Sequence, residues 1–309
     1  MSILRPSKEA ILDDLRSFVL NEAEERTGFL ATAVSKLNVV RRVQQGQKLS
    51  FNEPYLALIL QGKKKTYIAD KSFTYTAGDI VVTNLSLSSR TVVQEASFEK
   101  PFLSIVLTLD PLILSEVARR YGFDASEQAD APAMAVSQAN SDFLLAFARM
   151  SRLLQEEQRG LPFDKFYYEE LMLRLLASDL GRWACDLISP DSRVSKITKA
   201  VEILKKDFKE SIRVGRLAEA SNLSLSSFNR QFKTLTGTTP LQYQKQLRLT
   251  GSCVLKRGAC PKLHLMSDIP ASLSFPAITK NSSAYCRVKF AAAKPETSAR
   301  QLWETAIAK

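Results

Sequence analysis

The chain has 309 residues, of which 45% are hydrophobic, and a formal net charge of +11 at pH 7. This length suggests two or three domains, and the hydrophobic content is enough for sizeable buried cores, which argues against global disorder. No uninterrupted apolar run approaches the roughly 20 residues of a membrane span, and the N-terminal sequence MSILRPSKEAILDDLRSF lacks the apolar core of a secretory signal. We therefore expect a cytoplasmic protein with no membrane partner.

The first predicted elements are short β-strands that fill residues 37–110. Residues 55–60 form a continuous apolar run, and residues 66–68 and 72–75 flank a turn at Ala69-Asp70-Lys71, which predicts a hairpin. Further strand-like runs follow at residues 80–83, 91–94 and 102–109. Short strands at this near-regular spacing indicate a β-sandwich or a small barrel.

Three stretches of this region are Leu60-Gln61-Gly62-Lys63, Tyr75 with Ala77-Gly78-Asp79, and residues 107–111. Together they resemble the cupin-like sensor domain of the AraC/XylS family of bacterial transcription regulators. The resemblance implies a cupin-like β-barrel that senses a small-molecule effector. The candidates to line its pocket, with plain core packing as the alternative, are Tyr55, Tyr67, Phe73 and Tyr75.

The N-terminal domain lacks the residues of a metal-dependent cupin enzyme. Such enzymes usually hold the metal through histidines, and residues 1–250 contain no histidine. The four cysteines show no close paired spacing, so neither a zinc site nor a disulfide framework is expected. We therefore predict no metal, no cofactor and no enzymatic activity, with a metal-free cupin enzyme as an alternative.

Two amphipathic helices are predicted after the strands, at residues 141–159 and 163–188. In the AraC/XylS family such helices follow the barrel and often make the dimer contact, so the resemblance implies a homodimer. Packing on their own barrel is the alternative. Residues 188–192 have turn chemistry and precede a basic run, which predicts a linker.

The segment 211–249 carries the most informative pattern of the chain. An apolar-periodic run at residues 214–220 meets a break at Ser221-Asn222. Helical spacing then follows, and the residues expected to point inward are Leu225, Phe228, Phe232 and Leu235. Two helices joined by so short a turn can bury one shared face only by crossing steeply, which is the geometry of a helix-turn-helix. An ordinary helical hairpin is the alternative, and a helix at residues 194–208 should brace the pair.

This segment also resembles the first helix-turn-helix of the AraC/XylS family. The matching positions are Leu217-Ala218, Ser221, Phe228, Arg230, Phe232-Lys233, Thr236-Gly237, Pro240-Leu241-Gln242-Tyr243 and Arg248-Leu249. The resemblance implies that the second helix enters the major groove of double-stranded DNA. It also implies that Ser226, Asn229 and Arg230 occupy base-reading positions.

The outward residues of the second helix have chemistry that suits DNA. Asn can pair bidentately with adenine and Arg with guanine, and each such contact discriminates by roughly 1–3 kcal/mol. Ser224 is the expected N-cap, because its hydroxyl can accept from a free amide of the first turn, and Lys233 is expected to contact a phosphate. The candidate DNA-binding residues, each with solvated surface as the alternative, are Ser224, Ser226, Ser227, Asn229, Arg230 and Lys233.

The distribution of charge agrees with this placement of the DNA-binding part. Residues 1–190 hold 22 Lys+Arg and 24 Asp+Glu, a net charge of −2. Residues 191–309 hold 21 Lys+Arg and 8 Asp+Glu, a net charge of +13. Such asymmetry favours a polyanion-binding surface in the C-terminal part.

The C-terminal sequence departs from the family after Thr250. The family carries a second helix-turn-helix with Gly-Tyr, Ser, Gln-Phe-Ser-Arg, Lys, Phe-Gly and Pro, joined to the first by a long helix that would begin at residues 241–250. This ordered motif does not occur in residues 251–309, which hold three of the four cysteines, the single histidine and four of the twelve prolines. Proline interrupts helices, so an irregular tail is expected.

A shift of the reading frame accounts for this departure. When the codons of residues 262–290 are back-translated and moved by one base, the permitted choices include EAALDVGYSSVSQFSRDYKELFGLLPREI. Gly-Tyr then arises from Asp268-Ile269, Gln-Phe-Ser-Arg from residues 274–277, and Phe-Gly from Ser283-Ala284. One base per codon is a free choice in this test, and the shift point stays open between Leu249 and Lys262. We expect a tail that supplies no second recognition helix.

These patterns predict an α+β protein in three parts. Residues 1–188 form a cupin-like β-barrel with following helices, for sensing and dimerisation. Residues 189–250 form an all-α helix-turn-helix domain, and residues 251–309 a frame-shifted, poorly ordered tail. We predict a sequence-specific transcription regulator that responds to a small molecule and is impaired by its altered C-terminus. The alternative is a ligand-binding or dimerising protein that no longer binds operator DNA.

Overall fold

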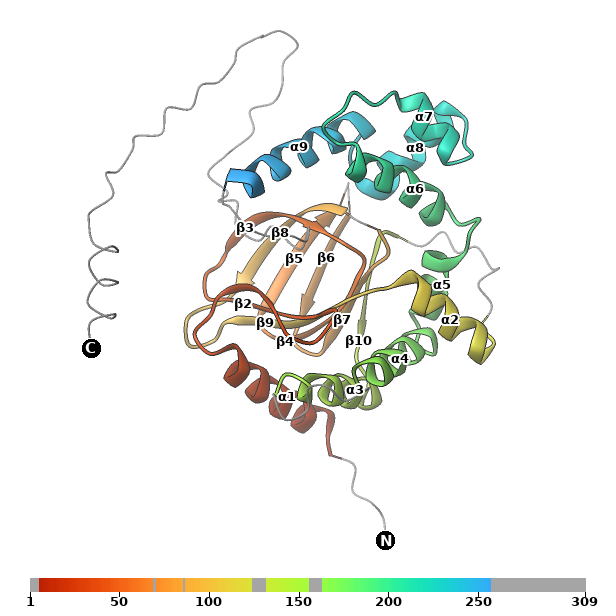
Figure 1. Cartoon of the computed structure of the whole chain (residues 1–309). Coiled ribbons are helices and arrows are strands. Elements are labelled where there is room, and N and C mark those ends of the chain that lie inside the picture. Colours follow the sequence, from red (N-terminus) through yellow and green to blue (C-terminus); the bar gives the residue numbers. More distant parts are fainter. Residues whose placement is uncertain (1–5, 69–70, 86, 124–131, 156–162, 257–309) are drawn as a thin grey trace, which may run out of the picture. The chain divides into compact units, whose positions relative to one another are not determined.

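The computed structural model describes residues 6–68, 71–85, 87–123, 132–155 and 163–256, with the backbone alone at 49–52, 87–88 and 249–256 (Figure 1). Strands dominate the first part of the chain and helices the remainder, so the predicted α+β class is confirmed. The tail beyond Lys256 and the turn residues Ala69 and Asp70 lie outside the described residues. The predictions of a poorly ordered tail and of an absent second recognition helix fall there.

The larger sheet has six strands, all paired antiparallel, in the order β1-β2-β9-β4-β7-β10. Their bounds are β1 Gly28–Ala31, β2 Leu37–Arg42, β9 Phe102–Thr108, β4 Tyr55–Gln61, β7 Asp79–Thr83 and β10 Met134–Gln138. The sheet is buried on both faces: Leu56 and Leu58 pack towards helices, whereas Ala57 and Ile59 face the second sheet. Two buried faces explain why residues 55–60 read as a continuous apolar run.

The smaller sheet has four antiparallel strands in the order β3-β8-β5-β6. Their bounds are β3 Gly46–Asn52, β8 Leu87–Glu95, β5 Lys63–Ile68 and β6 Lys71–Thr76. The predicted hairpin is confirmed by the pairing of β5 with β6. The predicted barrel is not closed in the described residues, because no strand pair there joins the two sheets. Buried side chains such as Tyr75, Val81 and Phe102 lie between the two sheets, as in two packed layers.

Five helices accompany the sheets in the described residues: α1 Lys8–Ala23, α2 Pro111–Tyr121, α3 Ser141–Arg152, α4 Phe163–Leu176 and α5 Gly181–Ile188. Residues of α1, α3 and α4 share one apolar core with the outer face of the six-stranded sheet (Figure 1). The predicted helix 163–188 is divided into α4 and α5, so its prediction as one helix is wrong. A Cβ on Gly181 would lie 2.0 Å from the carbonyl oxygen of Leu176, so the chain can turn back here only because this residue has no side chain.

Tyr168 of α4 forms hydrogen bonds with the backbone at the end of β9 and at the start of α2. Its hydroxyl donates to the carbonyl oxygen of Thr108 at 2.9 Å and accepts from the amide of Asp110 at 2.8 Å. The Asp110 carboxylate in turn caps α2 and receives the Lys36 ammonium, whose nitrogen lies 5.2 Å from the centre of the Tyr168 ring. One hydroxyl thus satisfies two backbone groups at a junction of the sheet and two helices.

We expect Tyr168→Phe to lower the free energy of unfolding of the full chain by about 1–3 kcal/mol, because two partly buried backbone groups lose their partner. Urea denaturation followed by circular dichroism measures this change. Tyr167→Phe is the matched control, because Tyr167 makes ring contacts with Phe163 and Phe166 that phenylalanine would keep. Equal stability of the two variants would contradict the bridging role of the Tyr168 hydroxyl.

Four further helices form the C-terminal part of the described chain: α6 Arg193–Lys206, α7 Val214–Ala220, α8 Leu225–Thr236 and α9 Pro240–Lys256. Ser192 begins α6, where its side chain accepts from the amide of Ser195 and donates to the carbonyl oxygen of Asp186. The expected helix at 194–208 is therefore present as α6. The helix α9 continues to Lys256, so the prediction of an irregular tail is wrong for residues 251–256. No described helix is long and apolar enough to cross a lipid bilayer.

Candidate nucleic-acid interface

The turn between α7 and α8 is short and closed by its own hydrogen bonds. The buried hydroxyl of Ser221 donates to the carbonyl oxygen of Leu217 at 2.8 Å, and the amide of Leu223 donates to that of Ala218 at 3.0 Å. Asn222 has a φ of 52°, a left-handed conformation that asparagine tolerates better than most residues. The predicted break at Ser221-Asn222 is confirmed, and it is what allows α8 to cross α7.

An aromatic cluster holds α8 against its neighbours. Phe228 and Phe232 are fully buried, with ring centres 5.5 Å apart, and Phe232 lies 5.5 Å from the ring of Tyr243 on α9. Leu235 is buried with them, as predicted. The prediction for Leu225 is wrong, because its side chain is 53% exposed. A helical side chain leans towards the N-terminus of its helix, so at the first position of α8 it projects past the helix end instead of onto the core.

Two residues of α9 bind the backbone of the segment between α6 and α7. The guanidinium of Arg248 donates to the carbonyl oxygens of Phe208 and Glu210, both at 2.6 Å. Gln244, one turn earlier, donates to the same two carbonyls. The sequence pattern alone did not assign this bracing role to either residue. The spacing of four residues on one helix was the available signal.

The amino end of α8 is capped and exposed. Ser224 has an extended conformation, and its hydroxyl accepts from the amide of Ser227 at 3.4 Å, so the predicted N-cap is confirmed. Ser226 is exposed, and its hydroxyl lies 3.3 Å from that of Ser224. Ser227 is partly buried. The first turn of α8 therefore presents small polar side chains to solvent.

The remaining candidates lie one and two turns further along α8. Asn229, Arg230 and Lys233 are exposed. The side-chain Nδ2 of Asn229 donates to the carbonyl oxygen of Leu225 at 3.0 Å, and the side-chain Oδ1 takes no part in that bond. Within the described chain, neither the guanidinium of Arg230 nor the ammonium of Lys233 has an ion-pair or hydrogen-bond partner. All six predicted residues thus lie at the N-cap or within the first two and a half turns of α8. The surrounding residues 191–256 are basic, with 13 Lys+Arg against 5 Asp+Glu.

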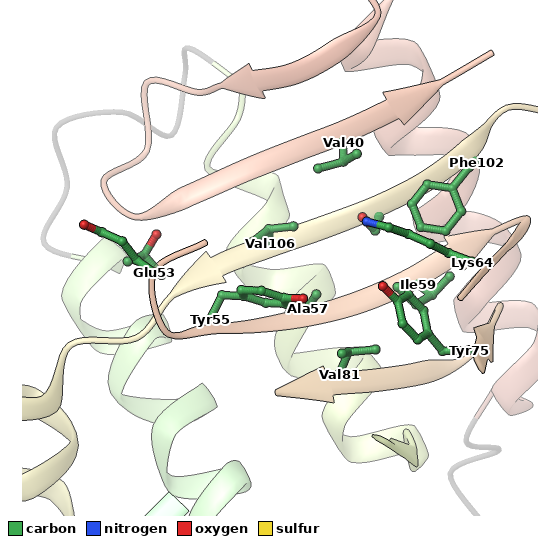
Figure 2. A pocket seen from close by; sticks show the side chains of 12 residues that line it. Val40, Glu53, Tyr55, Ala57, Ile59, Lys64, Tyr75, Val81, Phe102 and Val106 are labelled. Carbon is green, nitrogen blue, oxygen red and sulfur yellow. The ribbon is translucent and has the colours of Figure 1, made fainter. Parts of the chain in front are cut away.

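A second candidate site lies between the two sheets of the N-terminal part (Figure 2). The site is partly open to solvent. It is lined by Val40, Glu53, Tyr55, Ala57, Ile59, Lys64, Tyr75, Val81, Phe102, Ser104, Val106 and Thr108. Of the four predicted lining residues, Tyr55 and Tyr75 are present, whereas Tyr67 and Phe73 are not. Tyr67 stacks instead with the guanidinium of Arg90, 4.1 Å from its ring centre.

The hydroxyls of this pocket are neutral at ordinary pH. Burial raises the pKa of Tyr55 and of Tyr75 well above the usual value for tyrosine. The Tyr75 hydroxyl also shares a hydrogen bond of 2.8 Å with Thr66. Among the described residues, no group of three or more His, Cys, Asp or Glu side chains could hold a metal ion. The chemistry that this pocket offers is therefore binding through apolar contacts and a few polar groups.

The fold and the exposed helix define a class: a helix-turn-helix protein with a preceding two-sheet domain. Residues 33–183 match the model of the AraC-type transcriptional regulator N-terminus, and residues 204–245 match that of the bacterial regulatory helix-turn-helix proteins of the AraC family. The chain belongs to the AraC family. It is a DNA-binding transcription regulator, as the sequence predicted.

Several solved structures are similar to this chain. An apo single-residue variant of ToxT from Vibrio cholerae strain SCE256 is 15% identical, with a TM-score of 0.35, over 72% of this chain and 99% of that chain. Wild-type ToxT with bound unsaturated fatty acid, from the same strain, is 15% identical, with a TM-score of 0.32, over 72% of this chain and 96% of that chain. The AraC-like transcriptional activator CuxR is 12% identical, with a TM-score of 0.33, over 71% and 78%. No curated protein matches this chain.

Proposed function

We propose that this regulator reads its operator through α8, with Ser226, Asn229 and Arg230 at base edges and Lys233 at a phosphate. The observation that carries the proposal is the exposed guanidinium of Arg230 on a helix whose opposite face is fixed by Phe228 and Phe232. The amino-terminal residues of a recognition helix reach deepest into a major groove, and arginine pairs bidentately with guanine. Ser224 and Ser227, at the same end of α8, complete the proposed DNA-binding set.

Arg230→Ala is expected to weaken specific binding by about 1–3 kcal/mol, which is a loss of roughly 5- to 150-fold, and to relax specificity at one base pair. The operator is first selected from a random duplex library with the full wild-type chain. Fluorescence anisotropy at fixed salt then compares the dissociation constants of wild type and variant.

Two further variants give this experiment its controls. Arg119→Ala removes an exposed arginine of α2, far along the chain from α8, and should leave the dissociation constant unchanged. Lys233→Ala should weaken binding to all duplexes alike and reduce the slope of affinity against salt by about one unit, because a phosphate contact carries no sequence information. Unchanged operator binding by Arg230→Ala would overturn the proposed role of α8.

The same proposal assigns a separate role to each of three parts of the chain. Residues 1–188 serve as a sensor and dimerisation domain, residues 189–250 as the DNA-binding domain, and residues 251–309 as an altered tail. A small-molecule effector would occupy the pocket between the two sheets, which is partly open and lined by both apolar and polar side chains. The chain would act in the cytoplasm as a homodimer. Its proposed partners are DNA and a bound effector, and no enzymatic activity is proposed for it.

A second candidate function is a ligand-binding or dimerising protein that no longer binds operator DNA. The observation that favours it is the tail sequence, in which the expected second helix-turn-helix motif is missing in frame. Selection from the duplex library separates the two candidates. Enrichment of a consensus sequence by the full chain supports the regulator, whereas no binding, or binding without any consensus, supports the second candidate.

A further inference from the structure

The pocket between the sheets has a positive charge at one end. Lys64 of β5 lines it, and its ammonium lies 5.5 Å from the ring centre of Phe102. Arg42, at the end of β2, and Lys48 of β3 are close enough to act on its charge. Among the described residues, the Lys64 ammonium has no hydrogen-bond or ion-pair partner. Lys64 thus brings a positive charge to this end of the pocket, and two further cations, from β2 and β3, lie near it.

The opposite end of the pocket holds the carboxylate of Glu53, which lies 3.9 Å from the ammonium of Lys205 on α6. Figure 2 shows Glu53 at one end and Lys64 at the other, with the Lys64 side chain directed towards the space between them. Between these two ends the lining is mainly apolar and includes Val40, Ala57, Val81 and Val106. A ligand with one anionic end and an apolar body would therefore place the anion at the ammonium of Lys64, which lacks a partner in the described chain, since the carboxylate of Glu53 is already paired with a cation.

Building on the effector-binding function proposed above, we propose that this pocket binds an amphipathic organic carboxylate, whose carboxylate pairs with Lys64 and whose apolar body lies along Val40, Ala57, Val81 and Val106. A polyhydroxylated neutral ligand fits less well, because the mainly apolar lining leaves its hydroxyls without partners. An inorganic anion fits less well too, since it would leave the apolar lining uncovered. The apolar body provides affinity, and the ion pair provides selectivity for the charged headgroup.

The protonation of Lys64 supports this assignment. Burial lowers the pKa of Lys64 to about 8, and the positive charges of Arg42 and Lys48 act in the same direction. The side chain nevertheless keeps part of its surface accessible, so a ligand can reach it. A carboxylate beside the amine favours its charged form and raises the pKa. Binding near pH 8 should therefore take up protons, whereas the two neutral tyrosines at this site contribute no charge change between pH 6 and 9.

The test uses the full chain and a matched pair of probes, octanoate and 1-octanol, in isothermal titration calorimetry. Wild type is expected to bind octanoate at least tenfold more tightly than Lys64→Met does, while 1-octanol binds both with similar affinity. Titrations at pH 8 in buffers of different ionisation enthalpy should show proton uptake by wild type and none by Lys64→Met. Lys64→Arg, which keeps the charge, should retain octanoate binding and confirm that the site tolerates substitution.

The neighbouring lysine is the control. Side chains alternate along a strand, and the ammonium of Lys65 lies over the ring of Tyr67, which does not line the pocket. Lys65→Met should therefore bind octanoate as wild type does. Equal octanoate binding by wild type and Lys64→Met, with 1-octanol still bound, would overturn the carboxylate inference and leave the effector pocket standing. Failure of wild type to bind either probe would overturn both.

Discussion

Returning residues 262–290 to the shifted reading frame is expected to tighten operator binding by about 100-fold or more, because a second linked DNA-reading unit binds with the effective concentration set by its tether. The tether here is α9, whose described part runs from Pro240 to Lys256. The second unit would also add phosphate contacts. The slope of log affinity against log salt should then become about twice as steep, since it follows the number of phosphates contacted.

The experiment starts from a set of genes with one base inserted or deleted between codons 249 and 262, because the shift point is open within that range. Anisotropy at several salt concentrations compares each product with the unaltered chain on operators selected separately for each. Arg230→Ala in the repaired chain should lose affinity by the same factor as in the unaltered one if the two units read DNA independently. Identical affinity and identical salt slope in all repaired products would refute the frame-shift hypothesis.

Phe232→Ala is expected to lower the free energy of unfolding of the helix-turn-helix by about 3–5 kcal/mol, the usual cost of removing a buried aromatic ring. The ring of Phe232 is 0% exposed and contacts both Phe228 and Tyr243, so its loss opens a cavity between α8 and α9. Proteins are stable by only roughly 0.05–0.15 kcal/mol per residue, so a unit of this size should lose much or all of its stability and with it operator binding. Thermal unfolding and anisotropy on the same protein preparation measure both effects.

Leu225→Ala provides the matched control for this loss. It removes an apolar side chain from the same helix, but one that is 53% exposed, so the change in stability should stay within about 0.5 kcal/mol. A large destabilisation by Leu225→Ala, or an unchanged melting curve for Phe232→Ala, would contradict the described packing of α8.

Much of the helix-turn-helix was predictable because its signals are local. The N-cap Ser224, the break at Ser221-Asn222 and the inward Phe228 and Phe232 follow from hydroxyl chemistry, turn chemistry and a period of 3.6 residues. The error at Leu225 has the same origin, because periodicity assigns a face to a residue but does not say where the helix ends. The six DNA-binding residues remain predictions, since their contacts depend on a partner that the chain alone does not contain.

The N-terminal part was predicted less completely. Strands β4 to β9 matched apolar runs, but α1, α2 and β10 carried no pattern strong enough to predict them, and one predicted helix proved to be α4 and α5. The division at Gly181 depends on the approach of one residue to the carbonyl of Leu176. The open edges of the two sheets likewise depend on how side chains from distant strands fill the space between them.

By itself, the sequence determined that the chain is an α+β regulator with a helix-turn-helix, that residues 1–250 hold no histidine ligand, and that the tail departs from its family. Only the tertiary structure decided that the sheets stay open and that Tyr55, Tyr75 and Lys64 meet at one pocket. The physical reason is the range of the interactions. Caps, turns and helical periods involve residues a few positions apart, whereas a pocket is formed by strands whose neighbours in space are distant in sequence.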